Sequence, residues 1–288
     1  METLFSLKVS EAAEPVPIAK LLKAHGFSRS LLRRVKAADA LYKNGQQARL
    51  IDPVLPGDEI IVAQLPQESR IIPQSADLEL IYEDEHILVV NKPPGLLIHP
   101  LSKEGTGTLA NFLAGYLNGS RFHIVGRLDR GTSGLVLVAK DPLTAAKLFK
   151  ERQKALWTPQ YLAFVKGKLT GDGQIDLPLG RVEGKRWVSL EGKPALTRYR
   201  SLLFSDEASL VHVQLITGRT NQIRIHFAAC GHPLLGENIY AADTTLSRPA
   251  LHAWRLQLPN LPEFVAPLPE DLLKLKDAFW PQEEIPEH

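Results

Sequence analysis

Residues 125–140 of the chain read VGRLDRGTSGLVLVAK, and this stretch combines three different signals. Asp129 lies between Arg127 and Arg130, so a carboxylate is surrounded by cations. A glycine-rich turn follows, and residues 135–139 then have the apolar pattern of a buried strand. Because an aspartate among arginines is often a surface ion pair, the role of Asp129 depends on the sequence around this stretch.

The rest of the chain reads mainly as strands. We expect strands at residues 86–90, 135–139, 160–165, 197–204, 210–216 and 252–258, and helices at residues 108–117, 142–152 and 220–230. Strands outnumber helices and often follow one another directly. The sequence therefore predicts an α+β fold with a mostly antiparallel, mixed sheet in its larger part.

The chain length and the change of pattern at residue 78 predict two domains. Residues 1–64 are expected to form a small α/β domain with its core at about residues 15–64. Residues 65–77 contain prolines and glutamines and are typical of a linker. Residues 78–288 form the second, larger domain in this interpretation.

The small domain carries most of the positive charge. The whole chain has a net charge of +2, but residues 15–50 hold eight lysines and arginines against one acid. Two helices are predicted, at residues 18–24 and 29–37, and Ser28 suits the N-cap of the second. The spacing of Arg29, Arg33 and Lys36 puts them on one face of the second helix, and Asn44-Gly45 is typical of a tight turn between two strands. The candidate RNA-binding residues are Arg29, Arg33, Arg34, Lys36 and Lys43. A basic helix face suits the phosphates of structured RNA, although a solvated face or a protein-docking module would have the same composition.

Composition excludes several classes of protein. The longest apolar runs have five residues, which is far short of a membrane-spanning helix. The first 15 residues lack the apolar segment of a signal peptide, and one cysteine excludes an internal disulfide. The sequence therefore predicts a cytoplasmic protein.

Familiar cofactor and metal motifs are also missing from the sequence. It contains no phosphate-binding loop of the G-x-x-x-x-G-K-[ST] type, and His226, Cys230 and His232 fit no strong metal spacing. Residues 105–110 match G-x-G-x-x-A, but no strand directly precedes them, as a dinucleotide site requires. We therefore expect neither a metal nor a cofactor.

The ordered motifs resemble the pseudouridine synthases, in the branch that modifies large-subunit ribosomal RNA and some transfer RNAs. The resemblance rests on the Arg-Leu-Asp triplet at residues 127–129, IYEDEHILVVNKPPG at 81–95, YLAFVKG at 161–167, LITGRTNQIRIH at 215–226, GHP at 231–233 and LHA at 251–253. The N-terminal segment resembles an RNA-binding domain named after a small-subunit ribosomal protein. Gly126, Pro159 and Asn221 stand where this family usually has His, Lys and His.

The resemblance implies a role for each of four residues. Asp129 is the catalytic residue, Tyr161 stacks on the base or transfers a proton, Arg219 pairs with Asp129, and Arg127 fills the space that the flipped uridine leaves. The alternative for Tyr161 is a core tyrosine on a strand. Asp129 has to be ionised to stabilise positive charge on the ribose, and nearby arginine charge favours that form. The isomerisation needs no metal and no cofactor.

The implied function is the isomerisation of specific uridines in RNA, most simply in large-subunit ribosomal RNA. Two alternatives stay open. The substrate could be a transfer RNA, or the protein could be a non-catalytic RNA-binding or ribosome-assembly factor that keeps the fold. We expect a monomer that binds RNA and no membrane.

Overall fold

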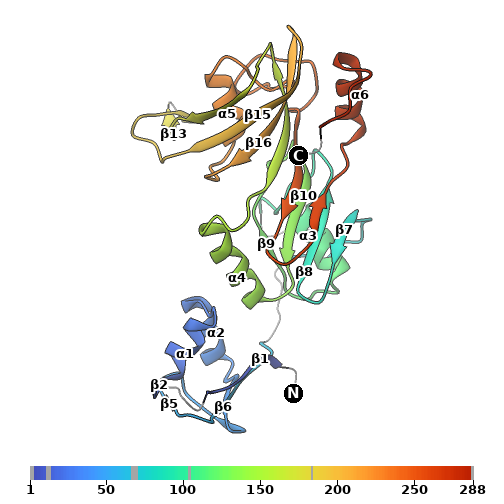
Figure 1. The fold of residues 1–288 in the computed structure, drawn as a ribbon. Helices are drawn as coiled ribbons and strands as arrows, with labels where there is room; N and C mark the ends of the chain where they lie inside the picture. Colours follow the sequence, from blue (N-terminus) through green and yellow to red (C-terminus); the bar gives the residue numbers. More distant parts are fainter. Residues whose placement is uncertain (1–2, 11–13, 66–70, 103–104, 183, 287–288) are drawn as a thin grey trace.

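The computed structural model describes residues 3–10, 14–65, 71–102, 105–182 and 184–286. The N-terminal part forms its own small sheet, in the order β1-β6-β3-β4, and its own hydrophobic core (Figure 1). Its elements are β1 (Thr3–Lys8), β2 (Val16–Pro17), α1 (Ile18–Ala24), α2 (Arg29–Ala37), β3 (Leu41–Lys43), β4 (Gln46–Gln47), β5 (Pro53–Val54) and β6 (Glu59–Ala63).

The local signals of this part act as the sequence predicts. The backbone N–H of Leu31 donates to the Ser28 hydroxyl at 3.1 Å, so Ser28 caps α2. Asn44 and Gly45 both have positive φ angles, 50° and 76°, which form the tight turn between β3 and β4. The sequence did not predict β1, which pairs antiparallel with β6. The domain boundaries stay predictions, and residues 66–70 of the expected linker lie outside the described residues.

The larger part is organised around one mixed sheet, in the order β12-β15-β16-β11-β17-β10-β8-β7, with β18 beside β17 and β9 beside β10. Its strands are β7 (Leu80–Glu83), β8 (Ile87–Lys92), β9 (His123–Val125), β10 (Ser133–Ala139), β11 (Gln160–Lys166), β12 (Asp172–Asp176), β15 (Leu196–Phe204), β16 (Ala208–Leu215), β17 (Leu251–Gln257) and β18 (Glu263–Val265). A separate hairpin contains β13 (Leu179–Val182) and β14 (Lys185–Val188). Among the described pairs in the large sheet, β10 and β17 are parallel and the rest are antiparallel, which confirms the predicted fold class.

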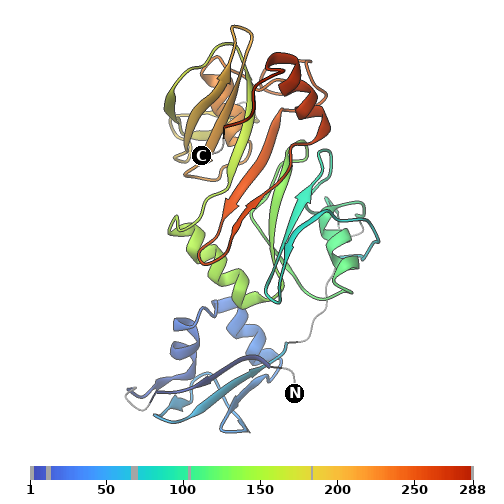
Figure 2. The same ribbon diagram turned by 45° about the vertical axis from the view of Figure 1, so that its right-hand side comes forward.

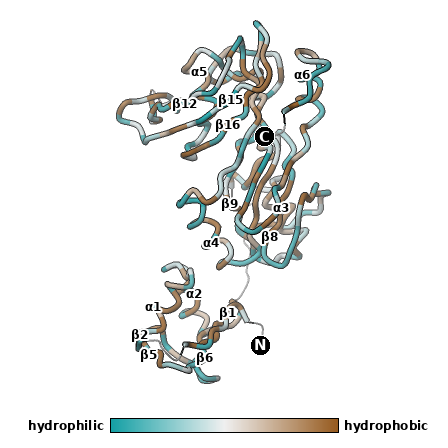
Figure 3. The backbone as a smooth tube through the Cα atoms, viewed as in Figure 1, coloured by the Kyte–Doolittle hydropathy of each residue, from teal (hydrophilic) through white to brown (hydrophobic). Residues whose placement is uncertain are grey.

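Helices cover both faces of the large sheet because successive strand residues point to opposite sides. The helices are α3 (Leu109–Tyr116), α4 (Pro142–Gln153), α5 (Gln222–Ala229) and α6 (Glu270–Phe279). Val89 packs in the core with α4, whereas its neighbours on β8 pack with α3. Tyr161 packs with α5, and its neighbour Leu162 packs with α6. Figure 2 shows α4 between the large sheet and the N-terminal part, and hydrophobic residues follow the central strands in Figure 3.

The two halves of the large sheet meet at β17, which lies between β10 and β11. The backbones of β10 and β17 approach very closely at Gly134, where an added Cβ would lie 2.1 Å from Ala253 O. Gly134 also has a φ of 105°, so the contact requires glycine for two reasons. The loop that carries Asp129 enters β10 just before this junction.

The strands expected from the sequence do not include β7, β9, β12, β13, β14 or β18, and helix α6 was not predicted either. None of the helices in the described part of the chain combines the length and the apolar character that crossing a lipid bilayer requires.

Candidate active site

A cavity of about 630 Å³ opens at the junction of the two half-sheets. The structure brings four of the predicted site residues to its wall: Arg127, Asp129, Tyr161 and Arg219. They come from the loop between β9 and β10, from β11, and from the loop before α5. Segments more than 90 residues apart in the sequence therefore form one site, as the resemblance implies.

The loop that carries Asp129 is held in place by two buried cations. The Lys92 ammonium group is fully buried and donates to Pro93 O at 2.9 Å, Leu96 O at 3.0 Å and Arg130 O at 3.4 Å. Burial lowers the pKa of Lys92 to about 8, the charge of a neighbouring arginine adds to this effect, and Asp129 opposes it. From the other side, Arg248 donates to Gly131 O at 3.1 Å. Both cations therefore fix the loop by hydrogen bonds to main-chain carbonyls and not by an ion pair with Asp129.

Burial determines the acidity of Asp129. It raises the pKa of the carboxyl group above its usual value, although Arg224, Arg127 and Lys92 act in the opposite direction. Buried Glu237 adds to the increase. The neighbouring arginine charge in the sequence predicts a shift toward the ionised form. In the structure desolvation outweighs that charge, because the cavity removes water from the carboxylate.

The arginine that acts most strongly on Asp129 is Arg224, on α5. Its side chain is buried and forms a two-pronged ion pair with Glu237, with N–O distances of 2.6 and 2.7 Å. Arg224 also lies 5.4 Å from the Tyr240 ring centre. Arg224 lies within the motif at residues 215–226, but the resemblance does not assign it a role. A buried arginine in the first turn of α5 is hard to distinguish from a surface arginine without the fold.

Arg219 does not have the position that the resemblance implies. Its Nε–H donates to Pro194 O at 3.1 Å, and no ion pair with Asp129 occurs among the described residues. The reason is the loop before α5. Gln222 accepts from Arg219 N–H at 2.9 Å and donates to Leu196 O at 3.0 Å, which ties this loop to β15. The expected pairing of Arg219 with Asp129 is therefore not found among the described residues, and the arginine whose charge acts most strongly on Asp129 is Arg224.

Asn221 lies directly against Asp129. When its amide nitrogen faces the carboxylate, it donates to Oδ2 at 2.7 Å and Oδ1 at 3.2 Å, and the amide oxygen accepts from the Tyr240 hydroxyl at 2.8 Å. This orientation is assigned from the hydrogen bonds, because it satisfies both partners. Asn221 has a φ of 57°, a left-handed conformation that asparagine tolerates well. The departure at residue 221 thus supplies a hydrogen bond to the ionised form of Asp129.

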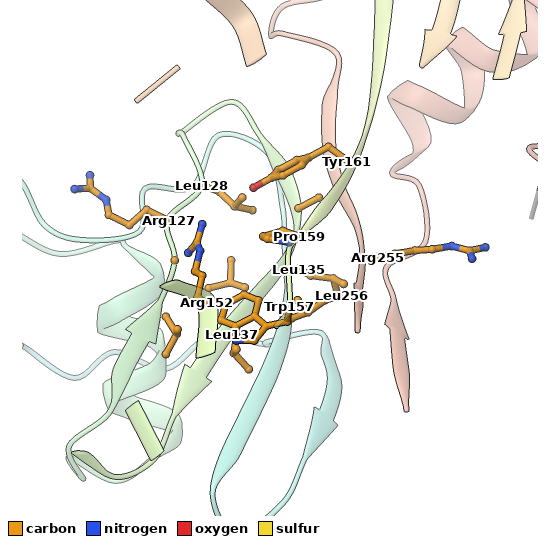
Figure 4. A pocket seen from close by; sticks show the side chains of 14 residues that line it. Arg127, Leu128, Leu135, Leu137, Arg152, Trp157, Pro159, Tyr161, Arg255 and Leu256 are labelled. Atoms are coloured by element: carbon orange, nitrogen blue, oxygen red, sulfur yellow. The ribbon is translucent and has the colours of Figure 1, made fainter. Parts of the chain in front are cut away.

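The Tyr161 ring belongs to the hydrophobic core, and Tyr161 also lines the main cavity. Figure 4 shows its hydroxyl group pointing toward the side where Leu128 lies. Burial raises the pKa of Tyr161 to about 12, Asp129 raises it further, and Arg152 opposes them. The hydroxyl group is therefore neutral at physiological pH. Both interpretations of Tyr161 from the sequence describe part of its position, since one side is core and the other is cavity wall.

Figure 4 shows a smaller pocket beside the main cavity, in which Arg127 points away from the pocket and Arg152 extends along Trp157. Arg127 is exposed at the rim. Both arginines also line the main cavity.

The predicted RNA-binding residues of the N-terminal part differ in their surroundings. Arg29, Arg33 and Lys36 are exposed on α2, as their spacing predicts. Lys43 instead forms an ion pair with Asp58 at 3.1 Å and donates to a main-chain carbonyl. Arg34 is half-buried and lines a second cavity between α2 and α4, where burial and the charge of Arg121 lower its pKa.

Metal ligands are not clustered in the described residues, where no three His, Cys, Asp or Glu side chains converge. Both ring nitrogens of His226 are within hydrogen-bonding distance of protein groups, Thr197 Oγ1 at 2.9 Å and Leu177 O at 3.0 Å.

Comparison with known proteins agrees with this geometry. Residues 86–229 match the model of the family described as RNA pseudouridylate synthase. The chain is 38% identical over 241 residues to the uncharacterized RNA pseudouridine synthase YhcT of Bacillus subtilis, covering 78% of this chain and 80% of that one. It is 34% identical to ribosomal large subunit pseudouridine synthase D of Haemophilus influenzae, covering 88% and 87%. The solved structure of human RNA pseudouridylate synthase domain containing 1 is similar, with a TM-score of 0.58, 27% identity, and coverage of 73% and 91%.

Proposed function

The chain belongs to the RNA pseudouridylate synthase family and isomerises uridine in RNA to pseudouridine; we propose that Asp129 performs this reaction on large-subunit ribosomal RNA. The observation that supports Asp129 is its position as the carboxylate that lines the cavity. Breaking a glycosidic bond develops positive charge on the ribose, and a carboxylate can stabilise or trap that charge.

The isomerisation breaks the bond from C1′ to N1 of uracil and forms a bond from C1′ to C5. The hydrogen on C5 is replaced by one on N1, so atoms and electrons balance without a redox partner. In this proposal Arg224 and Asn221 hold Asp129 and stabilise its ionised form. Neutral Tyr161 contacts the base or relays the proton.

The target base has to leave its stack before Asp129 can reach the sugar, at a cost of a few kcal/mol. Exposed Arg127 at the rim is suited to occupy the space that the base leaves. Arg219, with its Nε–H bound to Pro194 O, is proposed to shape the cavity wall and contact RNA.

The choice of ribosomal RNA rests on the relatives. Several proteins that are 34–36% identical to this chain are ribosomal large subunit pseudouridine synthases D. Pseudouridine mapping in a strain that lacks this protein tests the proposal, and we expect lost modification at one or more uridines of large-subunit ribosomal RNA. Loss confined to transfer RNA would reassign the substrate, and no loss in any RNA would favour a non-catalytic factor.

We further propose that residues 1–64 bind structured RNA through Arg29, Arg33 and Lys36. Replacing these three with glutamine should reduce the slope of log affinity against log salt by about 0.7–0.9 for each lost phosphate contact. Lys43→Gln is the control, since its charge is already paired with Asp58. An unchanged slope in the triple variant would mean a solvated helix face. A monomer acting in the cytoplasm remains our expectation, which light scattering and cell fractionation can check.

A further inference from the structure

Arg152, in the last turn of α4, lies in the wall of the main cavity. Its guanidinium carbon is 5.4 Å from the centre of the Trp157 ring, and the Trp157 indole N–H donates to Leu148 O at 3.2 Å. The tryptophan is buried, so it gives the guanidinium group a fixed surface to stack on. Arg152 is therefore a pre-positioned cation and not a freely moving surface side chain.

Glycine residues lie on two sides of the Arg152 guanidinium group. A Cβ added to Gly126 would lie 2.6 Å from Arg152 Nη1, and one added to Gly218 would lie 3.5 Å from Nη2. Arg152 thus uses the space that a side chain at residue 126 would fill. Gly126 belongs to the loop that carries Asp129, and Gly218 belongs to the loop that carries Arg219. The Arg152 guanidinium group therefore lies between these two loops.

The cavity carries more positive charge than its own carboxylate can balance. Arg127, Arg152, Arg219 and Arg224 line it, whereas Asp129 is the one acid among the described lining residues. Arg224 is paired with Glu237, and Arg219 donates to a carbonyl. In the described part of the chain, the Arg152 guanidinium group has neither a carboxylate nor a hydrogen-bond acceptor.

We propose that Arg152 binds a phosphodiester group of the RNA next to the target uridine. This inference rests on the proposed function and adds an anion site to it. Uracil and ribose are neutral, so the anionic groups that a flipped nucleotide brings toward the cavity are its phosphates. Guanidinium binds phosphate through two parallel N–H bonds, and the glycines at residues 126 and 218 leave room for the Arg152 guanidinium group to lie against their backbone at the cavity wall.

Neutralising one phosphate at a time tests this contact. The probe is a short RNA centred on the uridine found by the mapping experiment, with a neutral methylphosphonate in place of the phosphate on its 5′ or 3′ side. Binding is measured with the full-length Asp129→Asn protein, so that the probe is not converted. We expect one of the two substitutions to weaken binding about tenfold, and the salt slope to fall by about 0.7.

A double-mutant cycle then assigns the contact to Arg152. Arg152→Gln should weaken binding of the unmodified probe about tenfold, and the methylphosphonate should then cause no further loss. Additive losses would overturn the proposal, as would methylphosphonates that have no effect with Arg152 present. Arg198→Gln, which removes an exposed arginine outside the cavity lining, should preserve the full methylphosphonate effect.

Separate controls address a folding defect of the Arg152 variant and an error in the proposed role of Asp129. If Arg152→Gln does not fold, Arg152→Lys replaces it, because lysine keeps the charge but not the paired N–H groups. The lysine variant should lose affinity yet still discriminate against the same methylphosphonate, and equal affinity for both probes would contradict the site. An error in the role of Asp129 would appear as conversion of the probe by the Asp129→Asn protein, whereas an error in the Arg152 site would appear as equal binding of the unmodified and methylphosphonate probes, so the two failures are distinguishable.

Discussion

The carboxylate of Asp129 and the side-chain amide of Asn221 are in direct contact, with 2.7 Å between the amide nitrogen and Oδ2 when the nitrogen faces Asp129. The same amide reaches the Tyr240 hydroxyl at 2.8 Å. Burial raises the pKa of Asp129, whereas a hydrogen bond donated to the carboxylate favours its ionised form. The two effects therefore act in opposite directions. The acidity of Asp129 is therefore set by a balance that single substitutions can shift.

Asn221→Gly should shift this balance without straining the backbone, since glycine accepts the positive φ at residue 221. Loss of the amide raises the pKa of Asp129 further, so the acidic limb of kcat/KM against pH should move to higher pH. Activity well above that limb should change little. An acidic limb at the wild-type position would show that Asn221 does not stabilise the charge. Asn260→Gly, at another positive-φ asparagine, is the control.

Asp129→Asn should abolish detectable pseudouridine formation while RNA affinity stays within several-fold of wild type. The half-buried carboxylate destabilises the fold when it is ionised, so the melting temperature should stay equal or rise. Single-turnover assays and thermal melts measure both effects. A variant that keeps more than about a hundredth of the rate, or under ~3 kcal/mol of lost barrier stabilisation, would remove Asp129 from the catalytic role.

Arg224→Gln and Arg219→Gln should differ sharply. Removing Arg224 leaves fully buried Glu237 without its cation, which we expect to cost about 3–5 kcal/mol of folding free energy together with activity. Arg219→Gln should leave the melting temperature nearly unchanged and reduce activity less. The double variant Arg224→Gln with Glu237→Gln should recover much of the stability but not the activity. Equal activity losses in the two single variants would restore Arg219 as a partner of Asp129.

Arg127→Ala should impair a uridine in structured RNA much more than one in an unstructured oligonucleotide. The expected reason is that the arginine replaces the stacking that the flipped base loses, and little stacking is lost in an unstructured strand. Single-turnover rates on matched substrates at saturating enzyme provide the comparison. Equal losses on both would leave Arg127 as an electrostatic neighbour of Asp129.

His252 should make stability depend on pH. It is fully buried beside Ser133, and burial lowers its pKa to about 4. An unfolded histidine has a pKa of about 6.5. The contribution of neutral His252 to the free energy of unfolding should therefore be complete above about pH 6.5. It should fall by about 3 kcal/mol as the pH decreases from about 6.5 to about 4. Denaturant titrations of wild type and His252→Gln should show this difference, and parallel pH profiles would contradict it.

Much of the architecture could be predicted because local signals determine it. The bounds of α1 and α2 follow from apolar periodicity and the Ser28 cap, and the Asn44-Gly45 turn follows from its two residues. The short hairpin β13–β14 and the edge strand β18 have weaker signals, since their pairing depends on neighbours far along the chain. Helix α6 begins at Glu270 after a proline and has no side-chain cap hydrogen bond, so its start carries a weaker local signal than the start of α2.

In the candidate site, too, local motifs predict some residues, whereas other contacts depend on the whole fold. A motif placed Asp129, Tyr161 and Arg127 correctly at one cavity. Which arginine faces Asp129 depends on the rotation of α5 and on the Gln222 contacts that hold its preceding loop, and neither is visible in a motif. Burial likewise reverses the expected direction of the Asp129 pKa, and burial is a property of the whole fold.

The position of β17 has a consequence for synthesis. Residues 251–257 form the strand between β10 and β11, yet the residues lining the cavity end at Leu251. A growing chain can complete both half-sheets and still lack the strand that joins them, with two open edges exposed. The active site is therefore completed only after β17 has been synthesised, and a chain terminated at residue 250 would hold every proposed catalytic residue without the site.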